Sequence, residues 1–185
     1  AIAEVYASVF SPDPIEYRAL RGLLDLHEEM GILVQEVVGT RIGPYWMPAF
    51  SGVGFSNNEF RWSSRIARED GLLRIVPGLG TRAVDRLADD YPVLVAPGQP
   101  GLRVNQTPEE ALRYSPKKAD VINLETGVFE TVDMRQLLER HGGDFPLVRQ
   151  MISIADHDHL RRPVGLVDFS KEAVVLSFEG LISDS

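Results

Sequence analysis

The sequence has no cysteine among its 185 residues. This absence excludes disulfides, zinc–thiolate sites and thiol nucleophiles, and it fits a reducing compartment such as the cytoplasm. Long hydrophobic runs are missing too, because no apolar stretch approaches the roughly 18 residues that a membrane helix needs. These absences exclude a disulfide-stapled secreted domain and a cysteine-dependent enzyme, and we expect no membrane partner.

Basic residues are in the minority, with 19 Lys and Arg against 27 Asp and Glu and a formal net charge of −8. This balance disfavours non-specific binding to nucleic acid, although a phosphate site needs only local donors. The length and the 44% hydrophobic content predict one globular domain with a real core. The chain lacks an initiator Met and a signal peptide, and it begins inside a helical pattern, so we expect a piece of a longer protein.

Two stretches dominate the predicted sheet. Gly31–Gly39 is apolar except for Gln35 and Glu36, which predicts a strand buried over most of its length. Ala49–Asn58 alternates small and bulky residues and contains two glycines, which predicts a strand whose backbone something approaches closely. Together they predict either one wall of a flat ligand's pocket or an ordinary hairpin.

The remaining pattern predicts an α+β fold with a mainly antiparallel sheet and flanking helices. Helices are expected over residues 1–10, 14–24, 81–89, 134–140 and 146–151, and strands over 71–76, 91–96, 119–124, 128–132 and 173–178. Loops are expected over residues 39–48, 57–70 and 155–163, and the Pro- and Gly-rich stretch 97–116 marks a change of organisation.

A glycine turn follows the predicted strand at 71–76. Gly78-Leu79-Gly80-Thr81-Arg82-Ala83 satisfies G-x-G-x-x-A, the pattern of a dinucleotide-binding turn. However, the acid expected about 20 residues further on is missing, and so are repeated βαβ units. A Rossmann oxidoreductase is therefore disfavoured. The turn either packs a helix against the sheet or binds a phosphate in another way.

Other candidates for chemistry are weak. Asp156-His157-Asp158-His159 alternates metal-ligand types, but a solvated loop explains it better and no metal site is predicted. The six arginines between Arg61 and Arg86 face six acids between Glu59 and Asp90, so ion pairs are the default. One or two of these arginines still suit bidentate phosphate binding. No P-loop and no catalytic triad stands out.

The order of four motifs resembles the ATP-binding domain of phosphoenolpyruvate synthase and pyruvate phosphate dikinase. They are Val34-Gln35-Glu36-Val37-Val38, Phe50-Ser51-Gly52-Val53-Gly54-Phe55-Ser56, Val76-Pro77-Gly78-Leu79-Gly80-Thr81 and Asp89-Asp90-Tyr91-Pro92. The leading helices, with Val5-Tyr6-Ala7-Ser8, and the tail around Val174–Leu181 are similar to that family as well.

The resemblance implies an ATP-grasp domain, in which two α+β lobes close on ATP. Residues 1–185 are then a single partial domain, the adenine-side lobe, with a possible insertion at 97–170. It implies a hinge strand that contacts adenine, an adjacent pocket strand and a turn near the ribose. The implied ATP-binding residues are Gln35, Glu36, Val37, Val38, Ser51, Gly52, Gly78, Gly80 and Thr81.

In this family ATP phosphorylates a histidine on another domain, which passes the phosphoryl group to pyruvate with the help of Mg²⁺. The family's phosphate-binding Lys and Arg and its metal-binding Glu have no counterpart here, so we expect no catalytic residue in this chain and no activity from it alone. The implied partners are ATP, pyruvate, and the phosphohistidine and phosphoenolpyruvate/pyruvate domains of the parent protein. The family often has Glu where this chain has Thr81, which leaves a non-catalytic regulatory module as the alternative.

Overall fold

The computed structural model describes residues 2–27, 29–84 and 89–183. The chain divides into two compact units, Ala1–Val37 and Val38–Ser185.

The first unit contains two short helices, α1 (Ile2–Ser8) and α2 (Pro12–Leu20). Ser11 and Pro12 begin α2, and the Arg18 guanidinium donates a 2.8 Å hydrogen bond to the Val9 carbonyl between the helices. Both predicted helices are present, although α1 ends at Ser8 and α2 ends at Leu20, before the predicted ends at residues 10 and 24. Neither helix has a buried residue, so this unit has no core of its own among the described residues.

The strand predicted over Gly31–Gly39 is wrong. The segment has no regular structure, and Leu33 and Val34 are 80% and 79% exposed. A strand needs a neighbouring backbone to satisfy its N–H and C=O groups. Within the described parts of the chain no strand pairs with this segment, and an apolar pattern alone does not supply one.

The described residues of the second unit form ten strands and several short helices. The strands are β1 (Thr40–Ile42), β2 (Tyr45–Met47), β3 (Phe50–Phe55), β4 (Leu72–Pro77), β5 (Val93–Val95), β6 (Lys118–Asn123), β7 (Phe129–Asp133), β8 (Ile152–Ala155), β9 (Leu160–Arg161) and β10 (Val174–Leu176). The helices are η1 (Arg68–Asp70), α3 (Thr81–Val84), α4 (Pro108–Tyr114), α5 (Met134–His141), η2 (Gly142–Asp144), α6 (Val148–Met151) and α7 (Glu179–Ser183).

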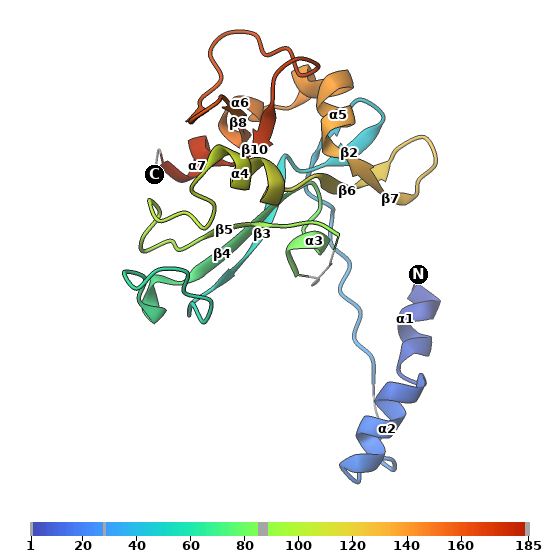
Figure 1. The fold of residues 1–185 in the computed structure, drawn as a ribbon. Helices are drawn as coiled ribbons and strands as arrows, with labels where there is room; N and C mark the ends of the chain where they lie inside the picture. Colours follow the sequence, from blue (N-terminus) through green and yellow to red (C-terminus); the bar gives the residue numbers. More distant parts are fainter. Residues whose placement is uncertain (1, 28, 85–88, 184–185) are drawn as a thin grey trace. The chain divides into compact units, whose positions relative to one another are not determined.

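The strands form three antiparallel sheets, with orders β1-β2-β6-β7, β3-β4-β5 and β10-β8-β9. One isolated parallel bridge, from Gly78 to Asp120, joins the end of β4 to β6. Figure 1 shows α5 and α6 near β8 and β10 in the C-terminal part of this unit. The α+β, mainly antiparallel fold is therefore confirmed.

Several parts of this unit differ from the prediction. The expected loop at 39–48 contains the hairpin β1–β2, which turns at Gly43 with φ 55°. The stretch 97–116 contains α4, and the expected loop at 155–163 contains β9, which pairs with β8. Neither β8 nor α7 was predicted. Of the helix predicted over 81–89, α3 accounts for Thr81–Val84, and residues 85–88 lie outside the described residues.

One apolar cluster runs through the second unit. Five of its side chains are fully buried, with 0% exposure: Ile42 and Met47 from the hairpin, Val121 from β6, and Met151 and Phe178. Segment 97–170 contributes β6, α5 and β8 to this cluster. That this segment is an insertion stays a prediction. Within the described residues, none of the helices combines the length and apolarity that a membrane crossing requires.

Candidate functional site

The glycine turn after β4 is held between β3 and β6. The Ser51 hydroxyl on β3 donates a 2.7 Å hydrogen bond to the Gly78 carbonyl, and the Leu79 amide donates a 2.9 Å bond to the Asp120 carbonyl on β6. Gly78 has φ 72°, and a Cβ there would lie 2.6 Å from the Asp120 carbonyl oxygen. Only glycine fits this approach without strain. The turn therefore brings Ser51, Gly78 and Gly80 together, and their contact with a nucleotide stays a prediction.

Thr81 begins α3 and joins the turn to a buried carboxylate. Its hydroxyl donates a 2.5 Å hydrogen bond to Asp120 Oδ2, and the Thr131 hydroxyl on β7 donates a 2.6 Å bond to Asp120 Oδ1. The Asp120 side chain is buried in β6, a few residues after the loop that leaves α4. The Thr81 hydroxyl therefore makes a structural hydrogen bond within the protein.

Arg82 lies next to Thr81 and is only 7% exposed. Its guanidinium pairs with Asp89 at 2.8 Å, with Asp120 at 3.5 Å and with Asp90 at 3.7 Å. Asp89 also accepts a 2.6 Å bond from the Lys118 ammonium, which is the main cause that lowers the pKa of Asp89. Both cations beside the turn are therefore matched by carboxylates, and the structure supports the packing role of the turn.

The β3 strand presents its glycines in two different settings. A Cβ at Gly52 would lie 2.5 Å from the Arg74 carbonyl, so this glycine lets β4 come close. A Cβ at Gly54 would meet no atom within 4 Å, and Gly54 is exposed. Among the described residues β4 is the one strand that pairs with β3, so the other edge of β3 is open.

The four residues of the predicted hinge strand do not form a strand. Gln35, Glu36 and Val37 are exposed and belong to the first unit, and Val38, which is 81% exposed, begins the second. Their contact with adenine, and the pocket they would form with Ser51 and Gly78, stay predictions.

Asp120 was not singled out from the sequence, and Arg74 was counted only as one of the six arginines between Arg61 and Arg86. Asp120 is the acid inside Ala119-Asp120-Val121-Ile122, and Arg74 is the base inside Leu73-Arg74-Ile75-Val76. The Arg74 guanidinium donates a 3.4 Å hydrogen bond to the Ala83 carbonyl in α3 and lies 5.6 Å from the centre of the Phe55 ring. One charge inside an apolar strand was the signal that could have found both.

Metal-ligand types do not gather elsewhere. In the parts of the chain that the structure describes, no group of three His, Asp or Glu side chains is arranged to hold a metal ion. His157 lies on the surface, with its ring 3.1 Å from Asp156.

The comparisons with known proteins bear on this geometry. A family model described as the AMP/ATP-binding domain of pyruvate phosphate dikinase matches residues 1–157. Neither the search of curated proteins nor the search of solved structures gave a match. Because the match covers most of the chain, including β3, the glycine turn and β6, the chain belongs to the family of pyruvate phosphate dikinase AMP/ATP-binding domains.

Proposed function

We propose that this chain is the adenine-side lobe of an ATP-grasp domain in a phosphoenolpyruvate synthase-like phosphotransferase. In the parent protein, ATP with Mg²⁺ phosphorylates a histidine on another domain, and that histidine passes the phosphoryl group to pyruvate. The observation that carries the proposal is the family match over the stretch in which Ser51, Gly78, Gly80 and Thr81 come together. A cytoplasmic location, which fits the absence of cysteine, is part of the proposal.

The charges near the turn support a lobe that binds the nucleoside and not the phosphates. Arg82 and Lys118 both pair with carboxylates, so neither has its charge available for a phosphate. Phosphoryl transfer depends on cations and Mg²⁺ positioned around the phosphates. We therefore expect no phosphotransfer from this chain alone.

Nucleotide titrations of the chain test the proposal. We expect AMP and Mg-ATP to bind with similarly weak affinity, because adenine and ribose are common to both. In amide NMR spectra both ligands should shift β3 and residues 78–81. Submicromolar binding of Mg-ATP with much weaker binding of AMP would contradict the proposal, and so would shifts confined to other regions.

A pair of glycine variants sharpens the test. Gly54→Val adds a side chain on the exposed part of β3, where it meets no atom within 4 Å, so the fold should tolerate it. If a nucleotide approaches this strand, the variant should weaken the AMP shifts. Gly101→Val is the matched control, because Gly101 also has open space around it and lies outside the predicted site.

The alternative function is a non-catalytic regulatory module. One observation favours it: Thr81 stands where the family often has Glu, and its hydroxyl is bound to Asp120. Measuring ATP-to-AMP turnover in the complete parent domain separates the two functions. The enzyme should convert ATP to AMP, whereas the module should show neither turnover nor nucleotide affinity.

A further inference from the structure

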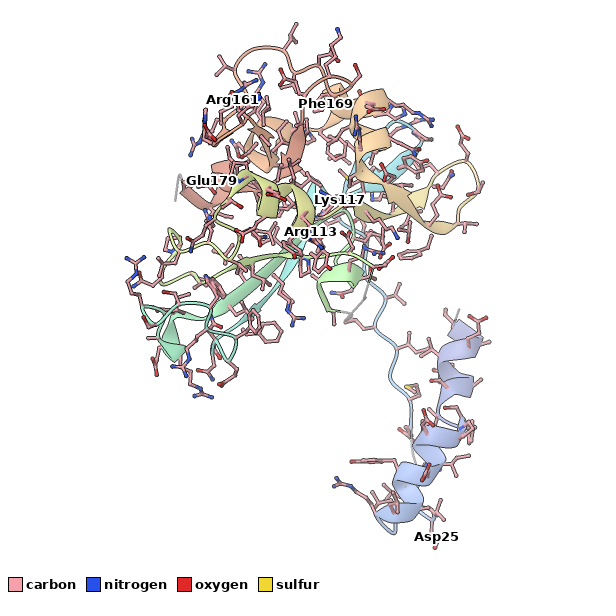
Figure 2. All side chains as sticks on the ribbon, in the orientation of Figure 1. Asp25, Arg113, Lys117, Arg161, Phe169 and Glu179 are labelled. Atoms are coloured by element: carbon pink, nitrogen blue, oxygen red, sulfur yellow. The ribbon has the colours of Figure 1, made fainter. Side chains whose placement is uncertain are left out.

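The cavity between α4, α5 and β10 is separate from the predicted nucleotide residues. It has a volume of about 310 Å³, and none of the residues predicted to bind ATP lines it. Cavities from about 300 Å³ upward are the usual size of small-molecule sites. Figure 2 shows two of the contributors, Lys117 after α4 and Phe169 in the loop that follows β9.

The floor and walls of this cavity are apolar. Met134 and Leu138 on α5 and Leu176 on β10 are at most 4% exposed and belong to the main apolar cluster of the unit. Val174 and Phe169 pack against the same cluster. A ligand body in contact with these side chains would leave water, so the cavity favours an apolar group.

The backbone around the cavity is fixed in place. The Lys117 amide donates a 2.8 Å bond to Asp90, and the Lys117 carbonyl accepts a 2.8 Å bond from the Met134 amide at the start of α5. A Cβ on Gly142 would lie 2.4 Å from the Phe169 ring, so that ring rests directly on the backbone after α5. The cavity is therefore largely preformed.

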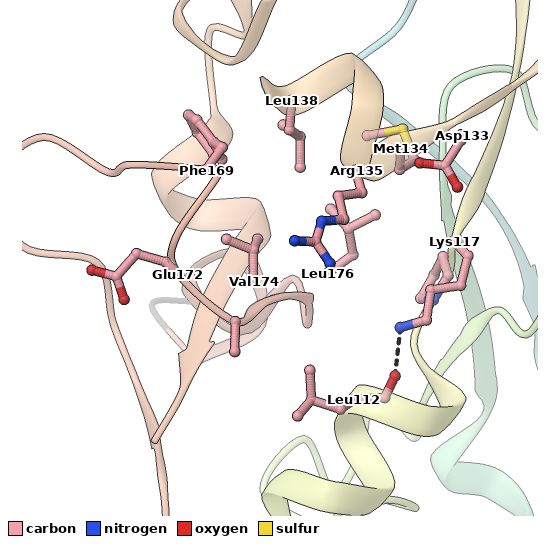
Figure 3. A pocket seen from close by; sticks show the side chains of 12 residues that line it. Leu112, Lys117, Asp133, Met134, Arg135, Leu138, Phe169, Glu172, Val174 and Leu176 are labelled. Atoms are coloured by element: carbon pink, nitrogen blue, oxygen red, sulfur yellow. Dashed lines mark hydrogen bonds between the residues drawn. The ribbon is translucent and has the colours of Figure 1, made fainter. Parts of the chain in front are cut away.

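Two cations point into this space. Figure 3 shows the Lys117 ammonium and the Arg135 guanidinium directed toward the region between α4, α5 and Val174. The ammonium donates hydrogen bonds to the Leu112 carbonyl and, at 2.7 Å, to the Ser115 hydroxyl. Its third N–H can therefore donate to a ligand. Both hydrogen-bond partners are neutral. Burial lowers the pKa of Lys117, and the nearby charges of Asp90 and Asp133 oppose this shift without cancelling it.

Asp133 and Glu172 are the carboxylates that line the cavity, and each has a partner within the protein. The Asp133 side chain accepts a 3.0 Å bond from the Gln136 amide and caps α5. Glu172 pairs with Arg161 at 3.1 Å, and Figure 3 shows its carboxylate directed away from the other labelled side chains. Arg135 uses its Nε on Glu139, so its terminal nitrogens remain for a ligand.

We propose that this cavity binds a small organic anion with an apolar body, whose carboxylate contacts Lys117 and Arg135 and whose tail lies on Met134, Leu138 and Leu176. An apolar floor beneath two cationic side chains, each of which keeps N–H groups for a ligand, suits this class of ligand. A neutral molecule would make no charged contact with Lys117 and Arg135, and an organic cation would be repelled by them.

Methyl NMR with a set of three ligands tests the proposal. Octanoate should saturably shift the Met134 methyl signal, while Met47 and Met151, which do not line the cavity, serve as internal references. Octanol should bind roughly tenfold more weakly or worse, because a charged hydrogen bond contributes about 1.5–3 kcal/mol. Octylamine, positively charged at neutral pH, should leave Met134 unshifted. Equal affinity for octanoate and octanol would overturn the proposal.

Single-residue variants test which side chains of the cavity bind octanoate. Lys117→Met should weaken octanoate by about tenfold or more while leaving octanol unchanged. Lys171→Met is the matched control, since Lys171 is next to the lining residue Glu172 in the sequence but does not line the cavity. This variant should bind octanoate as tightly as the unchanged protein. Val174→Phe should fill the space and abolish binding of both ligands. Each variant is first checked by its thermal melt, and Lys117→Gln replaces a Lys117→Met protein that does not fold.

Wild-type octanoate affinity in Lys117→Met, or a Val174→Phe protein that still shifts Met134, would show that the cavity is not the site. Failure of AMP to bind would leave this result untouched, because the two experiments use different ligands and different residues.

Discussion

At the scale of single residues, the second unit depends on a few positions where chemistry and geometry leave no choice. Gly78 adopts φ 72° against the Asp120 carbonyl, and Asp120 in turn accepts from Thr81 and Thr131. One glycine and one buried acid thus connect β3, β4, β6, β7 and α3. A substitution at either position acts on several elements at once.

Gly78→Ala should destabilise the second unit by roughly 2–4 kcal/mol. The left-handed φ costs about 1–2 kcal/mol for a non-glycine residue, and the clash with Asp120 adds the rest. Gly127 has a similar φ of 68° but no atom within 4 Å of a Cβ. Gly127→Ala should therefore cost only the conformational part. Urea unfolding measures both, and equal losses would contradict the role of the clash.

Asp168 gives a prediction about pH. The Ser170 hydroxyl, and after it Lys171, lower the pKa of Asp168 from 3.8 to about 2. Because the pKa is lower in the folded chain, the stabilisation from this carboxylate is present above about pH 4 and is lost as the pH falls through 2. NMR titration should give a midpoint of about 2.

Ser170→Ala should raise that midpoint toward 3.8, and Lys171→Met should raise it by less, since Ser170 is the larger cause. An unchanged midpoint in Ser170→Ala would contradict the assignment of the 2.6 Å bond from its hydroxyl.

At the scale of elements, the helices are short and depend on their ends. Helix α4 begins with a capping box: the Thr107 hydroxyl accepts from the Glu110 amide at 3.2 Å, and the Glu110 carboxylate accepts from the Gln106 and Thr107 amides. These backbone bonds also lower the pKa of Glu110. The cap explains why seven residues inside a Pro- and Gly-rich stretch form a helix.

Thr107→Ala should cost about 1 kcal/mol of stability, the usual loss for an N-cap. Thr126→Ala is the comparison, because Thr126 lies exposed in the turn before β7 and makes only a 3.4 Å contact there. It should change the free energy of unfolding by no more than about 0.5 kcal/mol. The difference between the two proteins in urea unfolding isolates the cap.

Elements whose partners are close in the sequence were predictable. The hairpin β6–β7 and the helix α5 follow from local apolar patterns and a turn, and both are confirmed. The strand at Gly31–Gly39 was wrong because pairing depends on a distant backbone, which no local pattern encodes. For the candidate site, the family resemblance named Ser51, Gly78 and Gly80, whose nucleotide contacts stay predictions. Asp120 was missed, because the bonds of that acid join residues 39 and 11 positions away.

At the scale of the whole molecule, the two units differ in how they are stabilised. The second unit has a continuous apolar cluster, whereas the helices of the first bury no residue. Isolated helices shorter than about 12–15 residues are marginal in water. The stability of the chain therefore resides in Val38–Ser185.

A chain that starts at Val38 should unfold at nearly the same urea concentration as the full chain, with a difference below about 0.5 kcal/mol. The far-UV circular dichroism of the full chain should lose helical signal before its fluorescence from Trp46 and Trp62 changes. A large shift of the urea midpoint on deletion would show that the first unit stabilises the second.

The open edge of β3 has a further consequence. Phe50-Ser51-Gly52-Val53-Gly54-Phe55 carries no charge and no proline, and its outer backbone groups have no strand beside them in the described chain. Such an edge can extend a sheet from one molecule to the next. Concentrated samples should therefore form oligomers, and Val53→Lys, which adds a charge to this strand, should keep the protein monomeric.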